Sequence, residues 1–356
     1  MMTFRLVLFV LCAFIGVPST YGQQLFRVIS YNVENLFDTQ DNPLADDAEF
    51  LPQGQRRWTP KRYHHKLQQI AKVITAAGEW TEPALVGLCE VENDSTLYQL
   101  CHHTPLRAQA YKYVCSDTDD PRGIRVALLY QRDQFALVGY ESLRIPFRGG
   151  EKRSRPLLHV WGRVGTGDTL DVFVCHFPSR SGGQLESEPF RLDAARYVRR
   201  VCDSLYRCRS HPHLLVMGDL NDTPTDRSLV EGLKAQPYAS DLNPSMTDTL
   251  TLYNLFARKR PGQPEGSHKY QGAWSQLDHC LVGGSLLRAD APFRLRPEGV
   301  RIFDADFLWT PDKTYLGRRP KRTFYGFTYE GGFSDHLPLI VDFYLHLSAE
   351  KEKDTE

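Results

Sequence analysis

Three polar residues that can do chemistry follow directly after an apolar run at residues 213–217. Gly218 ends the run, and Asp219, Asn221 and Asp222 come next. Such a run predicts a buried strand, and α/β sheets form crevices at the ends of their strands. A turn rich in Asp and Asn would have the same composition, because these residues favour turns on their own account. In an extended chain Asp219 and Asn221 point to one side, so we assign these two to a candidate site and Asp222 to the turn.

Other polar residues occupy the same kind of position, at an end of an apolar run. Taken singly, each has a structural explanation as a turn former, a helix-terminal charge or a packed histidine. Their repeated placement at strand ends predicts instead that they gather at one edge of the fold. The residues are Asn32 after the run 25–31, Glu90 after 84–89, His176 after 170–175, Asp278 near the start of 277–282, and Asp335 with His336 before 337–345.

The elements that must position these residues are many strands and a few helices. Thr59 as N-cap, Pro60 at the first position and Gly78 as the stop predict one helix, and apolar spacing predicts another over about 189–208. The strand count is too high for a simple doubly wound sheet, so we expect two packed sheets flanked by helices in a single domain over 23–347. Further strands are expected at 111–116, 124–130, 135–145 and 157–164, and residues 288–322 are expected to be irregular loops around one or two strands.

Seven blocks, in this order, resemble the endonuclease/exonuclease/phosphatase superfamily and cover nearly all of the chain after residue 22. The resemblance implies a four-layer α/β sandwich of two packed mixed β-sheets flanked by helices, and metal-dependent hydrolysis of phosphoesters. The blocks are Tyr31-Asn32-Val33-Glu34-Asn35, Leu88-Cys89-Glu90-Val91-Glu92-Asn93, Arg122-Gly123-Ile124-Arg125 with the following Val126–Tyr130, His176-Phe177-Pro178-Ser179-Arg180, Gly218-Asp219-Leu220-Asn221-Asp222, Gln276-Leu277-Asp278-His279 and Ser334-Asp335-His336-Leu337-Pro338.

The resemblance implies a metal site and a water activator. Asn32, Glu90 and Asp335 would hold the catalytic metal, and a donor set made only of oxygen suits Mg²⁺ or Mn²⁺ and not zinc. Asp219 would orient or deprotonate the attacking water, and Asn221 would donate its amide to the phosphate.

The resemblance also implies roles for two histidines. His336 would contact the phosphate with Asp278 behind it, since a His–Asp pair fixes the tautomer and favours the imidazolium. His176 would stabilise the phosphate or assist the leaving group. Neighbours in a regular strand point to opposite faces, so Asp335 and His336 can share a site only if the backbone there is irregular, which we predict.

Several further residues have two open interpretations. Glu34 could add to the metal shell. The basic runs at 152–155 and 318–322 could bind a phosphate backbone, although solvated faces are the interpretation we prefer, given the balancing acids. As substrate-binding candidates, with surface or packing roles as the alternatives, we name Arg180, Arg125, Tyr270 and Trp274.

Composition limits the classes of function and indicates export. The 356 residues carry 43 Lys plus Arg and 43 Asp plus Glu, and zero net charge argues against a strongly basic nucleic-acid binder.

The N-terminus predicts a signal peptide over 1–22 and a periplasmic or extracellular protein, with an uncleaved anchor as the alternative. The features that indicate it are Arg5, the apolar run 6–17 and a small-residue site before Gln23. No later run is apolar enough to span a membrane, so none is expected after cleavage. Residues 348–356 are predicted to be a charged disordered tail.

The seven cysteines after residue 22 are odd in number and form no CxxC pair, which argues against a disulfide framework and a zinc site. We expect a monomeric magnesium-dependent phosphodiesterase, specifically an endonuclease. The alternative substrates are a phospholipid head group, a nucleotide or an inositol phosphate. A non-catalytic binding scaffold is a remote alternative, because it would predict broken catalytic positions and none of the seven blocks is broken.

Overall fold

The computed structural model describes residues 23–150, 152–239 and 247–346. The predicted signal peptide and charged tail lie outside the described residues. The predicted two-sheet architecture is confirmed, and both sheets are mixed because each contains one parallel pair of long strands, β1 with β2 and β7 with β8. The first sheet has the order β14 (Phe293–Ile302), β19 (Leu339–His346), β1 (Gln23–Leu36), β2 (Leu85–Val91), β4 (Arg125–Tyr130), β3 (Lys112–Cys115).

The second sheet contains the strand that ends at Asp219. Its order is β5 (Phe135–Leu143), β6 (Leu157–Val164), β7 (Thr169–His176), β8 (His213–Asp219), β13 (Asp278–Gly283), β10 (Leu252–Asn254), β9 (Gln236–Pro237).

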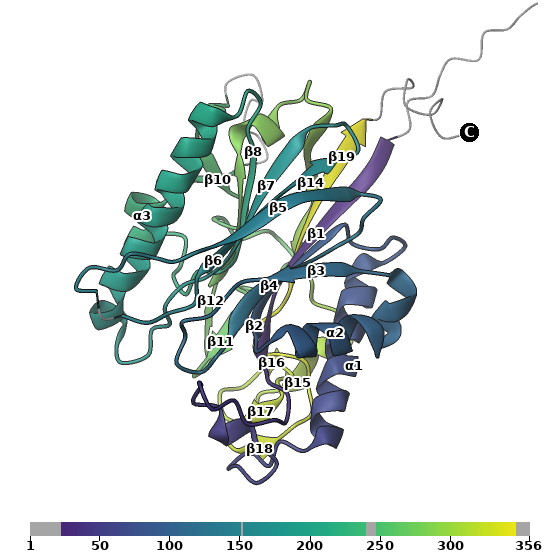
Figure 1. Cartoon of the computed structure of the whole chain (residues 1–356), viewed down its shortest axis with the longest axis vertical. Helices are drawn as coiled ribbons and strands as arrows, with labels where there is room; N and C mark the ends of the chain where they lie inside the picture. Colours follow the sequence, from purple (N-terminus) through teal and green to yellow (C-terminus); the bar gives the residue numbers. More distant parts are fainter. Residues whose placement is uncertain (1–22, 151, 240–246, 347–356) are drawn as a thin grey trace, which may run out of the picture.

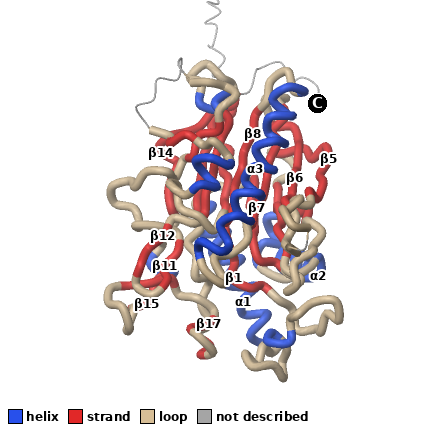
Figure 2. Tube along the Cα trace, turned by 90° about the vertical axis from the view of Figure 1, so that its left-hand side faces the viewer, coloured by secondary structure: helices blue, strands red, loops and turns tan. Residues whose placement is uncertain are grey.

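Helices cover the outer face of each sheet, which gives four layers (Figures 1 and 2). The helices α1 (Pro60–Gly78) and α2 (Asp94–His102) lie on the first sheet, and α3 (Gln184–Cys208) lies along the second. Alternate residues of β7 show how one strand serves two cores: Val172 and Val174 belong to the core that contains both sheets, whereas Phe173 and Cys175 belong to the core under α3.

The helix boundaries partly agree with the sequence. Thr59 is the N-cap of α1 and Gly78 its last residue, as predicted. The predicted start of the second long helix at about Pro189 is wrong, because α3 begins at Gln184. Pro189 is the sixth residue of α3, beyond the four N-terminal N–H groups that lack partners in any helix, so it costs α3 one interior hydrogen bond. Short helical turns occur at Ala48–Phe50, Pro105–Gln109, Ser228–Gly232, Gly284–Leu287 and Asp306–Leu308.

Two of the three two-stranded ribbons lie at the lower end of the molecule in Figure 1, and the third lies above them, level with the lower strands of the first sheet. Part of the region that the sequence indicated as irregular is therefore ordered, and β14 in the same region is a ten-residue edge strand. The ribbons are β11 (His268–Tyr270) with β12 (Ala273–Ser275), β15 (Trp309–Pro311) with β16 (Arg318–Pro320), and β17 (Phe324–Tyr325) with β18 (Thr328–Tyr329).

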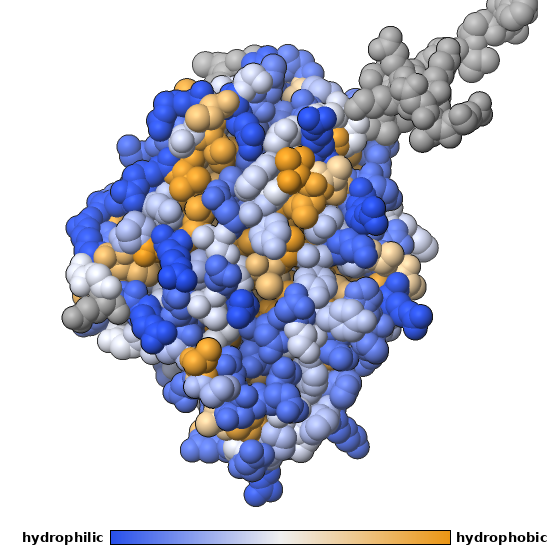
Figure 3. Space-filling view, in the orientation of Figure 1, coloured by the Kyte–Doolittle hydropathy of each residue, from blue (hydrophilic) through white to orange (hydrophobic). Residues whose placement is uncertain are grey.

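The surface on the face drawn in Figure 3 is mainly hydrophilic, with small separate apolar patches. Within the described ranges, no helix combines the length and hydrophobicity needed to cross a bilayer. The seven described cysteines are free thiols, and five of them, including Cys89, Cys175 and Cys280, are buried as small core residues.

Candidate active site

Strand register brings three of the predicted residues into one row. His176 at the end of β7 pairs with Asp219 at the end of β8, and Asp219 pairs with Asp278 at the start of β13. Gly218 makes this exit possible, because it has a φ of 131° and a Cβ there would lie 1.9 Å from the carbonyl oxygen of Cys175. The row is therefore set by backbone pairing and by one glycine.

Asp219 lies at the centre of the row and is buried. Its Oδ2 accepts a hydrogen bond from Asn32 Nδ2 at 3.0 Å and lies 3.6 Å from His176 Nε2 and 3.9 Å from His336 Nε2. Burial raises the pKa of Asp219 to about 7, with Asp278 adding to the rise and His336 opposing it. A carboxyl group with this pKa can accept a proton near neutral pH.

His336 is held by a buried acid. Its Nδ1 lies 2.7 Å from Asp278 Oδ2, and Ser267 Oγ donates to the same oxygen at 2.6 Å. Burial lowers the pKa of His336, but the carboxylates of Asp278, Asp219 and Asp335 outweigh this and raise it well above the usual 6.5. His336 is therefore protonated at neutral pH, with Nε2–H available to an anion.

The predicted irregularity at Asp335 and His336 is confirmed. His336 forms an isolated bridge with His268 ahead of β19, and its N–H donates to Ser334 Oγ. Ser334 Oγ in turn donates to the carbonyl of Asn32, which ties this segment to the end of β1. The bend lets His336 face Asp219 while the Asp335 carboxylate turns to Arg322.

His176 is neutral, and a buried arginine controls its tautomer. Arg155 Nη2 donates to His176 Nε2 at 2.9 Å, so the ring proton resides on Nδ1. Burial, with a contribution from Arg155, lowers the pKa of His176 well below 6.5. Arg155 also pairs with Asp120 at 2.6 Å and donates to the Phe177 carbonyl. Within the basic run 152–155, the preferred interpretation as a solvated face is wrong for Arg155, which is buried.

The expected extended geometry of Asn221 is wrong. Its φ is 53°, its N–H donates to Asp219 Oδ1 and its side-chain amide donates to the carbonyl of Phe177 at 3.1 Å. The turn at 219–222 uses local hydrogen bonds in place of strand pairing, so this side chain supports the turn. Arg180 also acts here, because it donates to the Asn221 carbonyl and pairs with Asp226 at 2.7 Å. The turn assignment of Asp222 is incomplete, since this buried acid also pairs with the buried Arg191.

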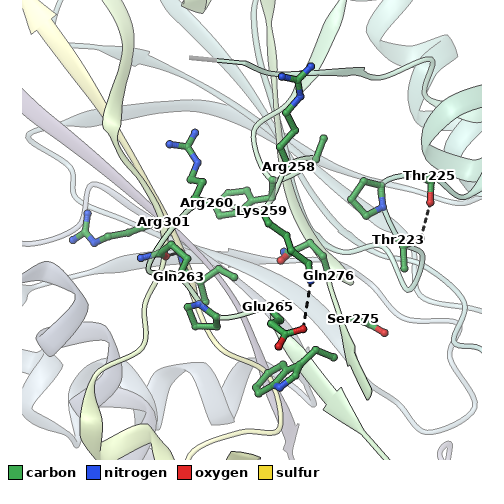
Figure 4. A pocket seen from close by; sticks show the side chains of 16 residues that line it. Thr223, Thr225, Arg258, Lys259, Arg260, Gln263, Glu265, Ser275, Gln276 and Arg301 are labelled. Carbon is green, nitrogen blue, oxygen red and sulfur yellow. Dashed lines mark hydrogen bonds and ion pairs between the residues drawn. The ribbon is translucent and has the colours of Figure 1, made fainter. Parts of the chain in front are cut away.

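The other three substrate-binding candidates separate in space. Arg125 donates to the carbonyls of Glu92 and Ser116, a structural role. Tyr270 is 63% exposed and lines a cavity that also contains Asp335. Trp274 lies in a different cavity of about 240 Å³, shown in Figure 4, where Lys259 pairs with Glu265.

A second layer of charge lies behind Asp335, and of its members Glu34 and the run that contains Arg322 were named from the sequence, but Lys66 was not. Arg322 donates to Asp335 Oδ2 at 2.6 Å and to Glu34 Oε1 at 3.2 Å, and Lys66 Nζ lies 3.9 Å from Glu34. Burial lowers the pKa of Lys66 to about 8, opposed by Glu34 and Asp335. The sequence carried one signal for Lys66, because this residue stands next to Leu67 on the apolar face of α1. The structure buries it there.

The oxygen donors fit a hard divalent cation, although the three predicted ligands, Asn32, Glu90 and Asp335, are engaged with other partners. Asn32 Nδ2 approaches Glu90 Oε1 at 3.4 Å, whereas Asp335 is engaged by Arg322. Carboxylates outnumber cations around this point, and excess oxygen-borne negative charge is what Mg²⁺ or Mn²⁺ requires. The carboxylates are Glu34, Glu90, Asp219, Asp278 and Asp335, and the cations are Lys66, Arg322 and His336. Donor atoms lie within 4.8 Å of one another in two groups of the described residues: His268, Asp335 and His336, and Asp219, Asp278 and His336.

A cleft of about 450 Å³ opens over the row of catalytic candidates. Glu90, His176, Asp219 and His336 line its floor. Basic side chains line its rim: Lys152 and Arg153 are exposed, and Arg122 is half-buried. An anion that enters this cleft would therefore meet positive charge first and the buried acids afterwards.

Comparison with known proteins agrees with this arrangement. Residues 27–345 match the model of the Endonuclease/Exonuclease/phosphatase family. No curated protein matches the chain.

Solved structures share the fold over nearly their whole length. An endonuclease/exonuclease/phosphatase family protein from Bacteroides thetaiotaomicron has 15% identity and a TM-score of 0.55, over 93% of this chain and 98% of that one. Truncated TDP2 from Caenorhabditis elegans has 15% identity and a TM-score of 0.53, over 90% and 97%. A mannosyl-6-phosphatase from Bacteroides thetaiotaomicron has 17% identity and a TM-score of 0.53, over 89% and 99%. At these identities the likeness establishes the fold alone.

Proposed function

The chain belongs to the endonuclease/exonuclease/phosphatase family, a family of phosphoesterases, and from that premise we propose that it is a divalent-metal-dependent phosphodiesterase that cleaves nucleic acid, acting as an endonuclease. The observation that carries the proposal is the position of the candidate residues between two cavities. Glu90, His176 and Asp219 line the cleft of about 450 Å³, and Asp335 lines a separate cavity of about 200 Å³. A phosphodiester carries a group on each side of its phosphorus, and this arrangement offers a place for both.

The side chains divide the chemistry between proton acceptance and charge stabilisation. Asp219 accepts the proton of the attacking water, for which a pKa of about 7 is suited. The Nε2–H of protonated His336 donates to a phosphate oxygen as charge builds there, and Asp278 holds the ring in that orientation. Neutral His176 accepts a hydrogen bond from Arg155, whose charge is paired with Asp120, and this contact holds the ring in place beside Asp219.

Asn32, Glu90 and Asp335 are the residues we assign to a cation. Bound Mg²⁺ or Mn²⁺ would neutralise charge on the phosphate and on the leaving oxygen. Asp335 would turn from Arg322 to take up that role, and Arg322 would keep its ion pair with Glu34.

A phosphomonoesterase that acts on a sugar phosphate is the second candidate. One solved neighbour with the same fold is named a mannosyl-6-phosphatase, whereas the TDP2 neighbours do not separate the two classes by their names. The exposed basic rim of the large cleft favours a longer anionic substrate, because each contacted phosphate adds to affinity. We further propose that the mature enzyme is an exported monomer.

Three substrates separate these possibilities. The protein from residue 23 onward is assayed on supercoiled plasmid, bis-p-nitrophenyl phosphate and p-nitrophenyl phosphate, with Mg²⁺ or Mn²⁺ and then with EDTA. We expect plasmid nicking and diester cleavage that EDTA abolishes and that Asp219→Asn lowers at least a thousandfold. Cleavage of the monoester alone would overturn the diesterase assignment, and cleavage in EDTA would overturn the metal requirement.

A further inference from the structure

The cavity on the Asp335 side has aromatic walls. We call it the tyrosine cavity and define it by Tyr270, Tyr315 and Tyr325, which are 63%, 44% and 37% exposed. The ribbons β11–β12, β15–β16 and β17–β18, together with the loop that carries Tyr315, bring these rings together from separate parts of the chain. The volume is about 200 Å³, and Asp335 lies at its inner end.

The cationic side chains around the tyrosine cavity are already paired. Lys269 Nζ pairs with Asp312 at 2.9 Å, and Arg319 forms a two-point ion pair with Glu330. Arg322 is held by Glu34 and Asp335. Arg319 also lies over the Tyr325 ring, 4.4 Å from its centroid, so the cavity offers the rings of Tyr270 and Tyr315 without spare positive charge, which suits an uncharged ring better than a second phosphate.

Neighbouring rings connect this cavity to His336, the histidine to which we assign the phosphate contact. The ring centroids of His336 and His268 are 4.6 Å apart, and those of His268 and Tyr270 are 6.4 Å apart at an interplanar angle of 15°. Gly272 on the hairpin lies close against Tyr315, because a Cβ at this glycine would be 3.0 Å from the Tyr315 Cβ. A ring joined to a phosphate at His336 would meet the exposed face of Tyr270.

We propose that the tyrosine cavity binds an unpaired nucleobase of the substrate strand next to the scissile phosphate, by stacking on Tyr270 and Tyr315. The proposal rests on the proposed nuclease function and adds a direction for the substrate strand. The base lies on the Asp335 side of the scissile phosphate, and the phosphates that follow along the strand lie on the basic rim with Lys152 and Arg153. Base–aromatic stacking tolerates any base, because every base has a π-face. The enzyme should thus prefer unpaired strands to duplex.

The test measures binding of two labelled oligonucleotides in EDTA by fluorescence anisotropy. One is single-stranded oligothymidylate, and the other has the same backbone without bases. We expect the wild type to prefer the base-bearing strand by about 5- to 100-fold. Tyr270→Ala with Tyr315→Ala should remove most of this preference, while Tyr270→Phe should keep it. Tyr140→Ala is the matched control, since Tyr140 is 52% exposed on the edge strand β5, outside the site.

Equal affinity of the wild type for both strands, or a preference that survives both alanine substitutions, would overturn the stacking proposal. Loss of glucose 6-phosphate hydrolysis in the tyrosine variants with unchanged oligonucleotide binding would overturn it in favour of a sugar ring. Failure of the nuclease function itself is recognised separately, by an enzyme that hydrolyses bis-p-nitrophenyl phosphate but neither nicks plasmid nor binds either strand.

Discussion

Replacing Asp278 with Asn removes the charge that faces the His336 imidazolium and keeps the size of the side chain. Two unit charges separated by the 2.7 Å between Oδ2 and Nδ1 attract by about 6 kcal/mol at an effective dielectric constant of about 20. At the 3.9 Å of Asp219 the same estimate is about 4 kcal/mol. Asp278 therefore contributes the larger share of the stabilisation of the imidazolium.

The expected consequence is a histidine that loses its proton at lower pH than in the wild type. We expect Asp278→Asn to lower the pKa of His336, because burial then outweighs the remaining carboxylates. Without the charged donor and its fixed tautomer, kcat/KM should fall by about 10²- to 10⁴-fold. The alkaline limb of the pH–rate profile should shift to lower pH.

The assay pairs kinetics with a direct titration. The pH–rate profile on bis-p-nitrophenyl phosphate is compared with the histidine ring signals of the same proteins in NMR. Asp171→Asn is the matched control, because it makes the same chemical change in a buried His–Asp pair, His159 Nε2 to Asp171 at 3.0 Å, at the far end of β7 from the site. Burial raises the pKa of Asp171, but hydrogen bonds from His159 and Arg209 outweigh this and lower it below its usual range.

The control variant Asp171→Asn has an expected effect of its own on the pH dependence of stability. A depressed folded-state pKa stabilises the fold above the unfolded-state pKa of about 3.9, and this stability is lost as the pH falls through the folded-state value. Asp171→Asn should thus destabilise the protein at pH 7 by about 3 kcal/mol in urea unfolding, by less below pH 4, and leave the pH–rate profile unchanged. A pKa of His336 within one unit of wild type in Asp278→Asn, or a kcat/KM within about threefold, would refute the reasoning.

Other predictions concern the neighbouring parts of the site. Arg155→Lys keeps a positive charge beside Asp120, but lysine lacks the second nitrogen that donates to His176. We therefore expect kcat to fall about 10- to 100-fold and the His176 ring signals to move in NMR, and an unchanged spectrum would contradict the contact between Arg155 and His176. Gly218→Ala should lower the free energy of unfolding in urea by about 2–4 kcal/mol, because the added Cβ would clash with the Cys175 carbonyl and the backbone has a positive φ. A variant as stable as the wild type would argue against the described backbone conformation at the end of β8. Glu90→Gln should weaken Mg²⁺ or Mn²⁺ binding at least tenfold in calorimetry, and unaltered binding would place the metal elsewhere.

Much of the scaffold is predictable from the sequence because strand burial leaves a local pattern. The apolar runs at 157–164 and 213–217 correspond to β6 and to most of β8 in the structure, and the polar residues that follow such runs do gather at one edge. Asn221 shows the limit of this reasoning. Its position two residues after Asp219 suggested an extended backbone, but its φ is positive and its amide donates to Phe177, although the residue still lines the cleft.

The contacts that complete the site join residues far apart in the chain. Arg322 and Glu34 are separated by 288 positions, and Arg155 meets His176 across two different strand ends. The sequence by itself determined the two-sheet fold, the strand exits and the kinds of side chain placed there, because periodicity and local propensity act over a few residues. Only the tertiary structure decided which cation faces which acid and which tyrosines share a cavity, since ion pairing and stacking depend on distances between strands and ribbons that no local pattern encodes.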